Sequence, residues 1–253
     1  MSKDKYLSIE TNQSVLLENL SWIEAETILN KYEVVLISLG SRMKEHGPHL
    51  PLNNDYIMAE RLKDMVIEQI AVAILPTLQY GFYPSFLEYP GSISINENAF
   101  KEFIMDICKS MHGYGKRKFY ILNTGISTLR PLQKAAEDLK ELDIVLNYLN
   151  LLEIESKLET NLLQQEGGTH ADEGETSIML YLQPDIVDMS KAVKDYDARS
   201  DRKGLTRDPE GSGLYSPTGV YGDSTLASEE KGKILVEAII KEVVSSIKKM
   251  QES

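Results

Sequence analysis

The sequence predicts an α/β fold with a mostly parallel central sheet. Four short, mostly apolar runs alternate with segments whose apolar residues have helical spacing. Strands that alternate with helices usually pair in parallel through βαβ crossovers. The 253 residues contain no repeat, no low-complexity tract and no obvious linker, so we expect a single domain over 1–253.

The first half of the chain is expected to contain two of these strands. Ser21 and Glu24 have the spacing of a capping box, which predicts a short helix to about Lys31. The apolar run that ends at Gly40 is typical of a buried parallel strand, and Asn96 can cap a later helix. In order, we expect a helix at 21–31, a strand at 33–40, a polar loop at 41–54, a helix at 57–70, a strand at 71–75 with Pro76 at its exit, a loop at 80–95 and a helix at 96–111.

The second half repeats the alternation twice and then ends in a long helix. Pro131 suits the first turn of a helix, and Gly167 and Gly168 can close one. In order, we expect a strand at 118–122, a helix around Pro131 to about 142, a strand at 143–148, a helix at 151–165, a short helix from near Glu175, a loop at 194–222 and a helix at 228–249.

Composition and charge exclude several classes of protein. Apolar residues make up 42% and charged residues 26%, a globular balance, and the net charge of −12 opposes binding to nucleic acid. No apolar run approaches the length of a membrane span, and no secretory signal is visible at the N-terminus. Cys108 is the single cysteine, which excludes an internal disulfide and a cysteine-based zinc cage. We therefore expect a cytoplasmic protein that binds neither membranes nor nucleic acid.

Histidine and carboxylate residues gather in two loops. His46, His49 and Asp55 follow the first predicted strand, and His170 begins the segment His170–Ser177, which contains Glu173 and Glu175. Ligands bind beyond the carboxyl ends of strands in open α/β sheets, so the loops after the first three predicted strands point toward one candidate pocket. Imidazole and carboxylate ligands suit zinc, manganese or iron, and such an ion activates water and polarises a carbonyl group. The alternative is that the histidines form hydrogen-bonded turns.

Four blocks of sequence resemble the signatures of the creatininase (creatinine amidohydrolase) family, in the family's order. The blocks are Gly40-Ser41 with Glu45-His46-Gly47-Pro48-His49-Leu50-Pro51-Leu52 and Asp55, then Tyr89-Pro90-Gly91-Ser92-Ile93-Ser94, then His170 to Ser177, and finally Ser216 to Asp223 with Ala227, Glu230, Lys231 and Gly232. The resemblance implies a three-layer α/β/α fold, often a hexamer. It also implies a two-metal site that hydrolyses C–N bonds of cyclic amides or formamides.

The departures from the family pattern are concentrated on one of the two implied metals. Counting back from His46, Lys44 stands at the position of a liganding glutamate, unless the extra residue in this loop moves Glu45 into that role. Gly125 stands where the family has a metal-binding histidine, and Ser127 where some members have a liganding glutamate. The family's Glu-His pair in the substrate loop is also absent near Ser85. These changes suggest one ion instead of two, with the Lys44 ammonium in the emptied place, or no ion.

The residues expected to form the site follow from this resemblance. His46 and Asp55 are expected to hold the ion with Glu175 or Glu45, while Glu173 or His170 moves protons. The residues assigned to the substrate pocket are His49, Lys44, Tyr89 and Asp223. Each has a structural alternative, such as a helix cap at Asp55, a first-turn acid at Glu175 or an exposed loop lysine at Lys44.

Two functions are consistent with the sequence. The first is a metal-dependent amidohydrolase acting on a creatinine-like compound or a formylaminopyrimidine of the flavin and deazaflavin pathways, and the altered substrate loop argues against ordinary creatinine activity. The second is a degenerate, non-catalytic member that keeps the fold and binds a small molecule or serves as an assembly subunit. Gly125 in place of histidine is the feature that separates them. A homo-oligomer is expected from the resemblance.

Overall fold

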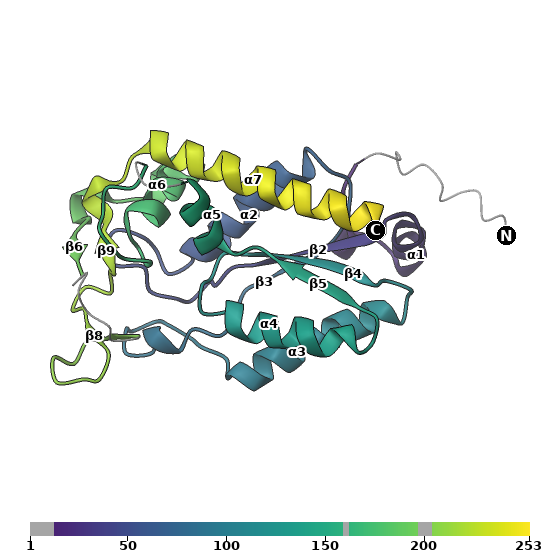
Figure 1. Ribbon diagram of the computed structural model, residues 1–253, viewed down its shortest axis with the longest axis horizontal. Helices are drawn as coiled ribbons and strands as arrows, with labels where there is room; N and C mark the ends of the chain where they lie inside the picture. The colour runs from purple at the N-terminus through teal and green to yellow at the C-terminus, as the bar shows by residue number, and fades with distance from the viewer. Residues whose placement is uncertain (1–12, 159–161, 197–203) are drawn as a thin grey trace.

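The protein, seen in a computed structural model that describes residues 13–158, 162–196 and 204–253, has a central five-stranded sheet with helices on both faces (Figure 1). The strands are β1 (Val15–Leu16), β2 (Val34–Leu39), β3 (Ala73–Leu78), β4 (Lys118–Asn123) and β5 (Val145–Tyr148). Their order is β1-β3-β2-β4-β5, and every neighbouring pair is parallel. The predicted three-layer α/β fold is therefore confirmed.

Strand β2 shows why helices cover both faces of the sheet. All six of its residues are buried, and successive side chains of a strand point to opposite faces. Val34 and Leu36 belong to one hydrophobic core, and Val35 and Ile37 to the other. The first core includes side chains of α2 (Asn54–Ile67), α5 (Leu151–Leu158), α6 (Glu173–Leu182) and α7 (Glu229–Glu252). The second includes side chains of α1 (Trp22–Lys31), α3 (Glu97–His112) and α4 (Leu129–Lys140), with Cys108 among them.

The chain changes face at the central strand. The crossover from β2 to β3 runs through α2 on the first face, whereas α3 and α4 connect β3 to β4 and β4 to β5 on the second face (Figure 1). Strands β2 and β4 lie side by side, and their last residues, Leu39 and Asn123, are partners in register. The loops that leave these two strands thus begin together, where α/β sheets usually bind ligands.

Helices α6 and α7 pack so closely that only glycine fits at their contact. A Cβ atom added at Gly232 of α7 would lie 1.8 Å from the carbonyl oxygen of Ser177 in α6. The Ser177 hydroxyl also accepts from the backbone N–H of Ser228, the N-cap of α7, at 3.0 Å. Asp172 caps α6 by accepting from the N–H of Glu175. The start of α6, which carries site residues, is therefore fixed to the longest helix of the described chain.

Several element boundaries differ from those expected. Pro76 lies inside β3 and not at its exit, because the register with β2 shifts between Ile37 and Leu39 and the irregularity accommodates a residue without an N–H. Helix α2 begins at Asn54, and α5 ends at Leu158 although a helix to 165 was expected. Residues 159–161 of that expected helix lie outside the described residues.

Short elements complete the fold. Strand β1 was not predicted, because two residues give no readable alternation. The expected loop at 194–222 contains two-residue strands, and its residues 197–203 lie outside the described ranges. The short strands are β6 (Lys194–Asp195) paired with β9 (Gly222–Asp223), and β7 (Leu205–Thr206) paired with β8 (Leu214–Tyr215). Short 3₁₀ helices lie at Leu17–Asn19, Pro84–Phe86, Pro184–Ile186, Met189–Lys191 and Ser224–Leu226. Within the described ranges, no helix combines the length and the hydropathy that crossing a membrane requires.

Candidate metal centre

Three segments of the chain bring the predicted site residues together at the carboxyl end of the sheet. The loop after β2 supplies His46, the first turn of α2 supplies Asp55, and α6 with the segment before it supplies Glu175 and His170. The Thr124 hydroxyl, directly after β4, donates to the backbone oxygen of Asp55 at 3.1 Å. The start of α2 is thereby tied to the ends of both central strands.

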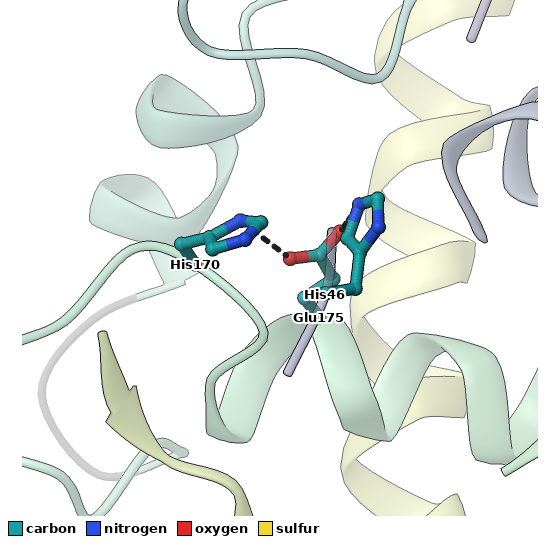
Figure 2. A group of neighbouring side chains, drawn as sticks. All are labelled: His46, His170 and Glu175. Atoms are coloured by element: carbon teal, nitrogen blue, oxygen red, sulfur yellow. Dashed lines mark ion pairs between the residues drawn. The ribbon is translucent and has the colours of Figure 1, made fainter. Parts of the chain in front are cut away.

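Glu175 lies between two imidazole rings (Figure 2). Its Oε1 is 3.3 Å from Nε2 of His46, and its Oε2 is 3.7 Å from Nδ1 of His170. One ligand atom from each of these three residues lies within 4.8 Å of the others, which is a spacing that could hold a metal ion. Of the residues predicted as ligands, His46 and Glu175 are in this group, and His170, predicted to move protons, is its third member.

The second ring nitrogen of each histidine already has a partner. Nδ1 of His46 lies 2.8 Å from the carbonyl oxygen of Lys44, and Nε2 of His170 lies 3.0 Å from that of Glu45. A carbonyl oxygen only accepts, so these two nitrogens carry hydrogen. The opposite nitrogens, Nε2 of His46 and Nδ1 of His170, face Glu175. Histidines that ligate metals are held in this way by a hydrogen bond from the other nitrogen, so the donor set fits one divalent ion.

The carboxyl group of Glu175 is also held in position. Asn54 donates its amide to Oε1 at 3.1 Å, and the N–H of Ala171 donates to Oε2 at 2.7 Å. Ala171 is fully buried and has a φ of 48°, a left-handed conformation that costs about 1 kcal/mol or more outside glycine. This conformation aims its N–H at the carboxylate. The segment from His170 to Glu175 therefore holds a strained backbone where the ligand group is assembled.

Burial and neighbouring charges act in opposite directions on the site. Burial disfavours the charged form of His46, but the carboxylates of Asp55 and Glu175 outweigh it and raise its pKa to about 9. Burial likewise opposes the charge of Lys44, and Asp55 and Glu175 raise its pKa above the ordinary value. For Glu175, burial is outweighed mainly by His46, so its pKa lies well below the ordinary range. The site therefore favours positive charge beside its carboxylates.

Asp55 and Glu45, both predicted as ligands, have other partners in the structure. Oδ1 of Asp55 lies 2.8 Å from Nε2 of His46, and Oδ2 forms a 2.7 Å ion pair with Lys44. Asp55 is the second residue of α2 and not its N-cap, which is Asn53. Glu45 lies outside the group of three, and its carboxyl group contacts Nε2 of His170 at 2.9 Å and the N–H of Gly47 at 2.8 Å.

A cavity of about 340 Å³ lies against this group. Lys44, His170 and Glu175 line it, and Lys44 is 4% exposed, so it is not a surface lysine. Much of the remaining wall is apolar and comes from distant parts of the chain: Phe86, Ile126, Leu151, Ile178, Leu205 and Leu214. Ser85, Thr124, Ser127, Thr169, Asp172 and Tyr221 add polar atoms. The dimensions suit a small molecule.

Besides His46, Asp55 and Glu45, four predicted residues do not line this cavity. Glu173 accepts from the backbone of Gln164 and Gln165 and pairs with Lys231, so it is not placed to move protons at the group. Asp223 caps a short 3₁₀ helix and lies 3.6 Å from Lys194. The Tyr89 hydroxyl donates to the backbone oxygen of Ser216 at 2.8 Å. His49 contacts the Thr176 hydroxyl at 2.8 Å, beside the ligand group but outside the cavity.

Sequence reasoning missed two residues that shape the site. Asn54 precedes Asp55, and its position in a polar stretch at the start of a helix was a usable signal. Tyr83 packs against Gly125, since a Cβ atom added to this glycine would lie 2.9 Å from the tyrosine ring. No local pattern in the sequence joins positions 83 and 125.

Comparisons with known proteins find relatives that match this chain over most of its length. The creatinine amidohydrolase of Pseudomonas putida is 26% identical over 264 residues, which cover 94% of this chain and 97% of that protein. The 3-dehydro-scyllo-inosose hydrolase of Thermotoga maritima is 27% identical over 259 residues, which cover 92% of this chain and 82% of that protein. A crystal structure of creatinine amidohydrolase has a TM-score of 0.79 at 22% identity, over 95% of this chain and 99% of that one.

Two other creatininase structures, with TM-scores of 0.75 and 0.77, are described as a manganese form and a Zn-Zn form. At 22% identity these likenesses show the fold alone. The family model described as Creatininase, creatinine amidohydrolase, matches residues 18–247. This match extends over most of the chain and confirms the resemblance carried by the four sequence blocks, so the protein belongs to the creatininase family.

Proposed function

We propose that the protein is a metal-dependent amidohydrolase that uses one divalent ion to hydrolyse a C–N bond of a cyclic amide or a formamide. The observation that carries this proposal is the group of His46, His170 and Glu175 beside a cavity of about 340 Å³. Family membership supports hydrolysis, because relatives of this chain are named for the hydrolysis of creatinine and of 3-dehydro-scyllo-inosose. The name amidohydrolase, carried by the relative that acts on creatinine, supports a C–N bond as the target.

The ion would be held by Nε2 of His46, Nδ1 of His170 and the carboxylate of Glu175. Zinc, manganese and iron suit such imidazole and carboxylate ligands. When bound, the ion supplies a water molecule of lowered pKa and polarises the carbonyl group of the substrate.

Other residues keep these ligands in position. The carbonyl oxygens of Lys44 and Glu45 accept from Nδ1 of His46 and Nε2 of His170, which leaves the opposite nitrogen of each ring to bind an ion. The Asn54 amide and the Ala171 N–H each hold one oxygen of Glu175. Ligands held in this way lose little conformational freedom on binding an ion.

The cavity selects the kind of substrate. Its largely apolar wall favours a compact substrate with little charge. Lys44 faces the same cavity and contacts Asp55, and its ammonium has three N–H bonds, so one can donate to a carbonyl oxygen of the substrate. Such a charged donor would stabilise an oxygen that gains negative charge during hydrolysis.

A second candidate is a family member that binds a small molecule without hydrolysing it. The observation that favours this candidate is the pairing of Lys44 with Asp55 beside Tyr83, on the side where Gly125 offers no ligand. In this case the cavity would still bind its compound, and the ion would be dispensable.

A test of hydrolysis separates the two candidates. The purified chain with added Mn²⁺ or Zn²⁺ is incubated with creatinine, other cyclic amides and a formylaminopyrimidine, and products are followed by NMR. We expect hydrolysis of one class, its loss with EDTA, and its loss in His46→Ala and Glu175→Gln. His112→Ala is the matched control, because His112 is the last residue of α3 and belongs to neither the ligand group nor the cavity wall. Activity that persists in His46→Ala would contradict the proposal.

A further inference from the structure

Lys44 is a buried cation that shares a carboxylate with the candidate metal group. Its Nζ lies 2.7 Å from Oδ2 of Asp55, and the other oxygen of Asp55 lies 2.8 Å from Nε2 of His46. The Asp55 side chain is fully buried, and that of Lys44 is 6% exposed. One carboxyl group therefore faces two positions for positive charge, and a residue of this chain already occupies one of them.

The ammonium is enclosed by aromatic rings and by a fixed loop. Nζ lies 5.3 Å from the ring centroid of Tyr83 and 5.2 Å from that of Phe86, distances at which aromatic rings attract a cation. The backbone N–H of Lys44 donates to Leu52, and its carbonyl oxygen accepts from His46. The lysine and the histidine are therefore positioned by the same loop.

The packing around Tyr83 excludes another ligand from the end of β4. Gly125 follows this strand, and any Cβ atom there would lie 2.9 Å from the Tyr83 ring and 3.2 Å from the Thr128 hydroxyl. A longer side chain at position 125 could reach the ammonium only if Tyr83 moved. Both the charge and the space beside Oδ2 of Asp55 are thus taken by residues of the chain.

The charges of this group balance with a single divalent ion. Three carboxylates contact Lys44 or the two histidines, namely Asp55, Glu175 and Glu45. Together they carry three negative charges when ionised. The ammonium and one divalent ion carry three positive charges, with both histidines neutral as ligands. A second divalent ion would leave a buried excess of two positive charges, which is costly at low dielectric.

We propose that the Lys44 ammonium is a built-in cation that takes the place of a second metal ion, so that each chain binds one divalent ion. This inference deepens the proposed function and rests on the same ligand group. It makes the number of bound ions a property of residue 44, which can be measured without a substrate.

The test measures Mn²⁺ binding by calorimetry and by metal analysis after equilibrium dialysis. We expect one ion for each wild-type chain. Lys44→Gln removes one positive charge but keeps a donor for Asp55, and we expect one ion bound about tenfold more tightly. Lys44→Glu adds a fourth carboxylate, and we expect two ions. Lys63→Gln is the matched control, because Lys63 is another buried lysine, paired with Glu60 at 2.8 Å on α2, and it lines no part of the cavity. Its binding should equal that of the wild type.

Each other outcome rejects the inference. Two ions for each wild-type chain would overturn it, and with it the single-ion part of the proposed function, but would leave metal-dependent hydrolysis intact. No binding in the wild type would overturn both proposals. Equal or weaker binding in Lys44→Gln, or one ion in Lys44→Glu, would also overturn it. Circular dichroism with saturating Mn²⁺ verifies folding, and if Lys44→Glu does not fold, Lys44→Gln and the wild-type stoichiometry decide.

Discussion

Lys44 and Glu45 are neighbours in sequence, but their side chains serve different partners. Lys44 pairs with Asp55 in α2, whereas Glu45 reaches His170 in the segment before α6. Gly47, at φ 69°, lets the loop turn back so that its N–H donates to Glu45. These partners lie elsewhere in the chain and are chosen by tertiary packing. The spacing around His46 therefore could not show which of the two side chains stood in the ligand position.

Stability of the protein at acidic pH is expected to depend on His49. This residue is 2% exposed, and burial lowers its pKa from 6.5 to about 4. The unfolded chain therefore binds a proton between pH 6.5 and 4 that the folded chain excludes. The resulting stabilisation is complete above pH 6.5 and is lost as the pH falls toward 4, by up to about 3 kcal/mol.

Chemical denaturation of the wild type and of His49→Gln across this pH range measures the effect. The wild type should lose more unfolding free energy than the variant as the pH falls, because glutamine does not titrate. Carboxyl groups titrate in both proteins and cancel in the difference. A difference between the two proteins that stays constant from pH 7 to pH 4 would contradict the prediction.

Cys108 is expected to be unreactive in the native protein. It is fully buried in the second core, and burial raises the pKa of its thiol to about 12. Because the thiolate is the reactive form, an aromatic disulfide reagent at pH 8 should modify almost none of the native protein within minutes. In denaturant, the same reagent should modify one thiol for each chain. Rapid modification of the native protein would show that the core opens.

Helix α7 illustrates how an element can position the site through its packing against α6 without lining the cavity itself. In Gly232→Ala, the added methyl group would meet the backbone of Ser177, and α6 would have to shift. We expect a loss of about 2–3 kcal/mol in unfolding free energy. We also expect weaker Mn²⁺ binding, because Glu175 lies in the first turn of α6. Lys233→Ala, at an exposed neighbouring position, is the control and should change neither quantity appreciably.

The sequence predicted where helices and strands form better than it predicted which of their side chains face the site. Capping residues such as Ser21 and Asn96 were found because their signals are local. Glu173 and Glu175 both lie in the first turn of α6, but residues two apart on a helix point to nearly opposite sides. Only one of these two carboxylates could therefore face the metal group. Glu173 pairs with Lys231, which leaves Glu175 on the side of the two histidines. The contact between Tyr83 and Gly125 depends on packing in the same way.

The whole molecule is expected to unfold as one unit and to be stabilised by a metal ion. The first core joins residues from Val34 to Met250, and the ligand group joins β2, α2 and α6 through their adjoining loops. An ion that binds only the folded chain raises the unfolding free energy by about 2.7 kcal/mol at 100 times its Kd.

Thermal unfolding with added Mn²⁺ tests this expectation. We expect a single transition whose midpoint rises with Mn²⁺ concentration and returns to its starting value with EDTA. His46→Ala should abolish the shift, whereas His112→Ala should retain it. Two separate transitions would show that the two faces of the sheet unfold independently. An equal shift in His46→Ala would show that the ion binds elsewhere.

The pairing of Lys44 with Asp55 affects how much metal the protein needs when metal ions are scarce. An ion can be captured by a chelator or by a competing protein, but an amino group joined to the backbone cannot diffuse away. Part of the positive charge that the buried carboxylates need is therefore present from the moment the chain is synthesised. Under the one-ion proposal, a cell that makes this protein would supply one metal ion for each copy and would obtain the remaining positive charge from lysine.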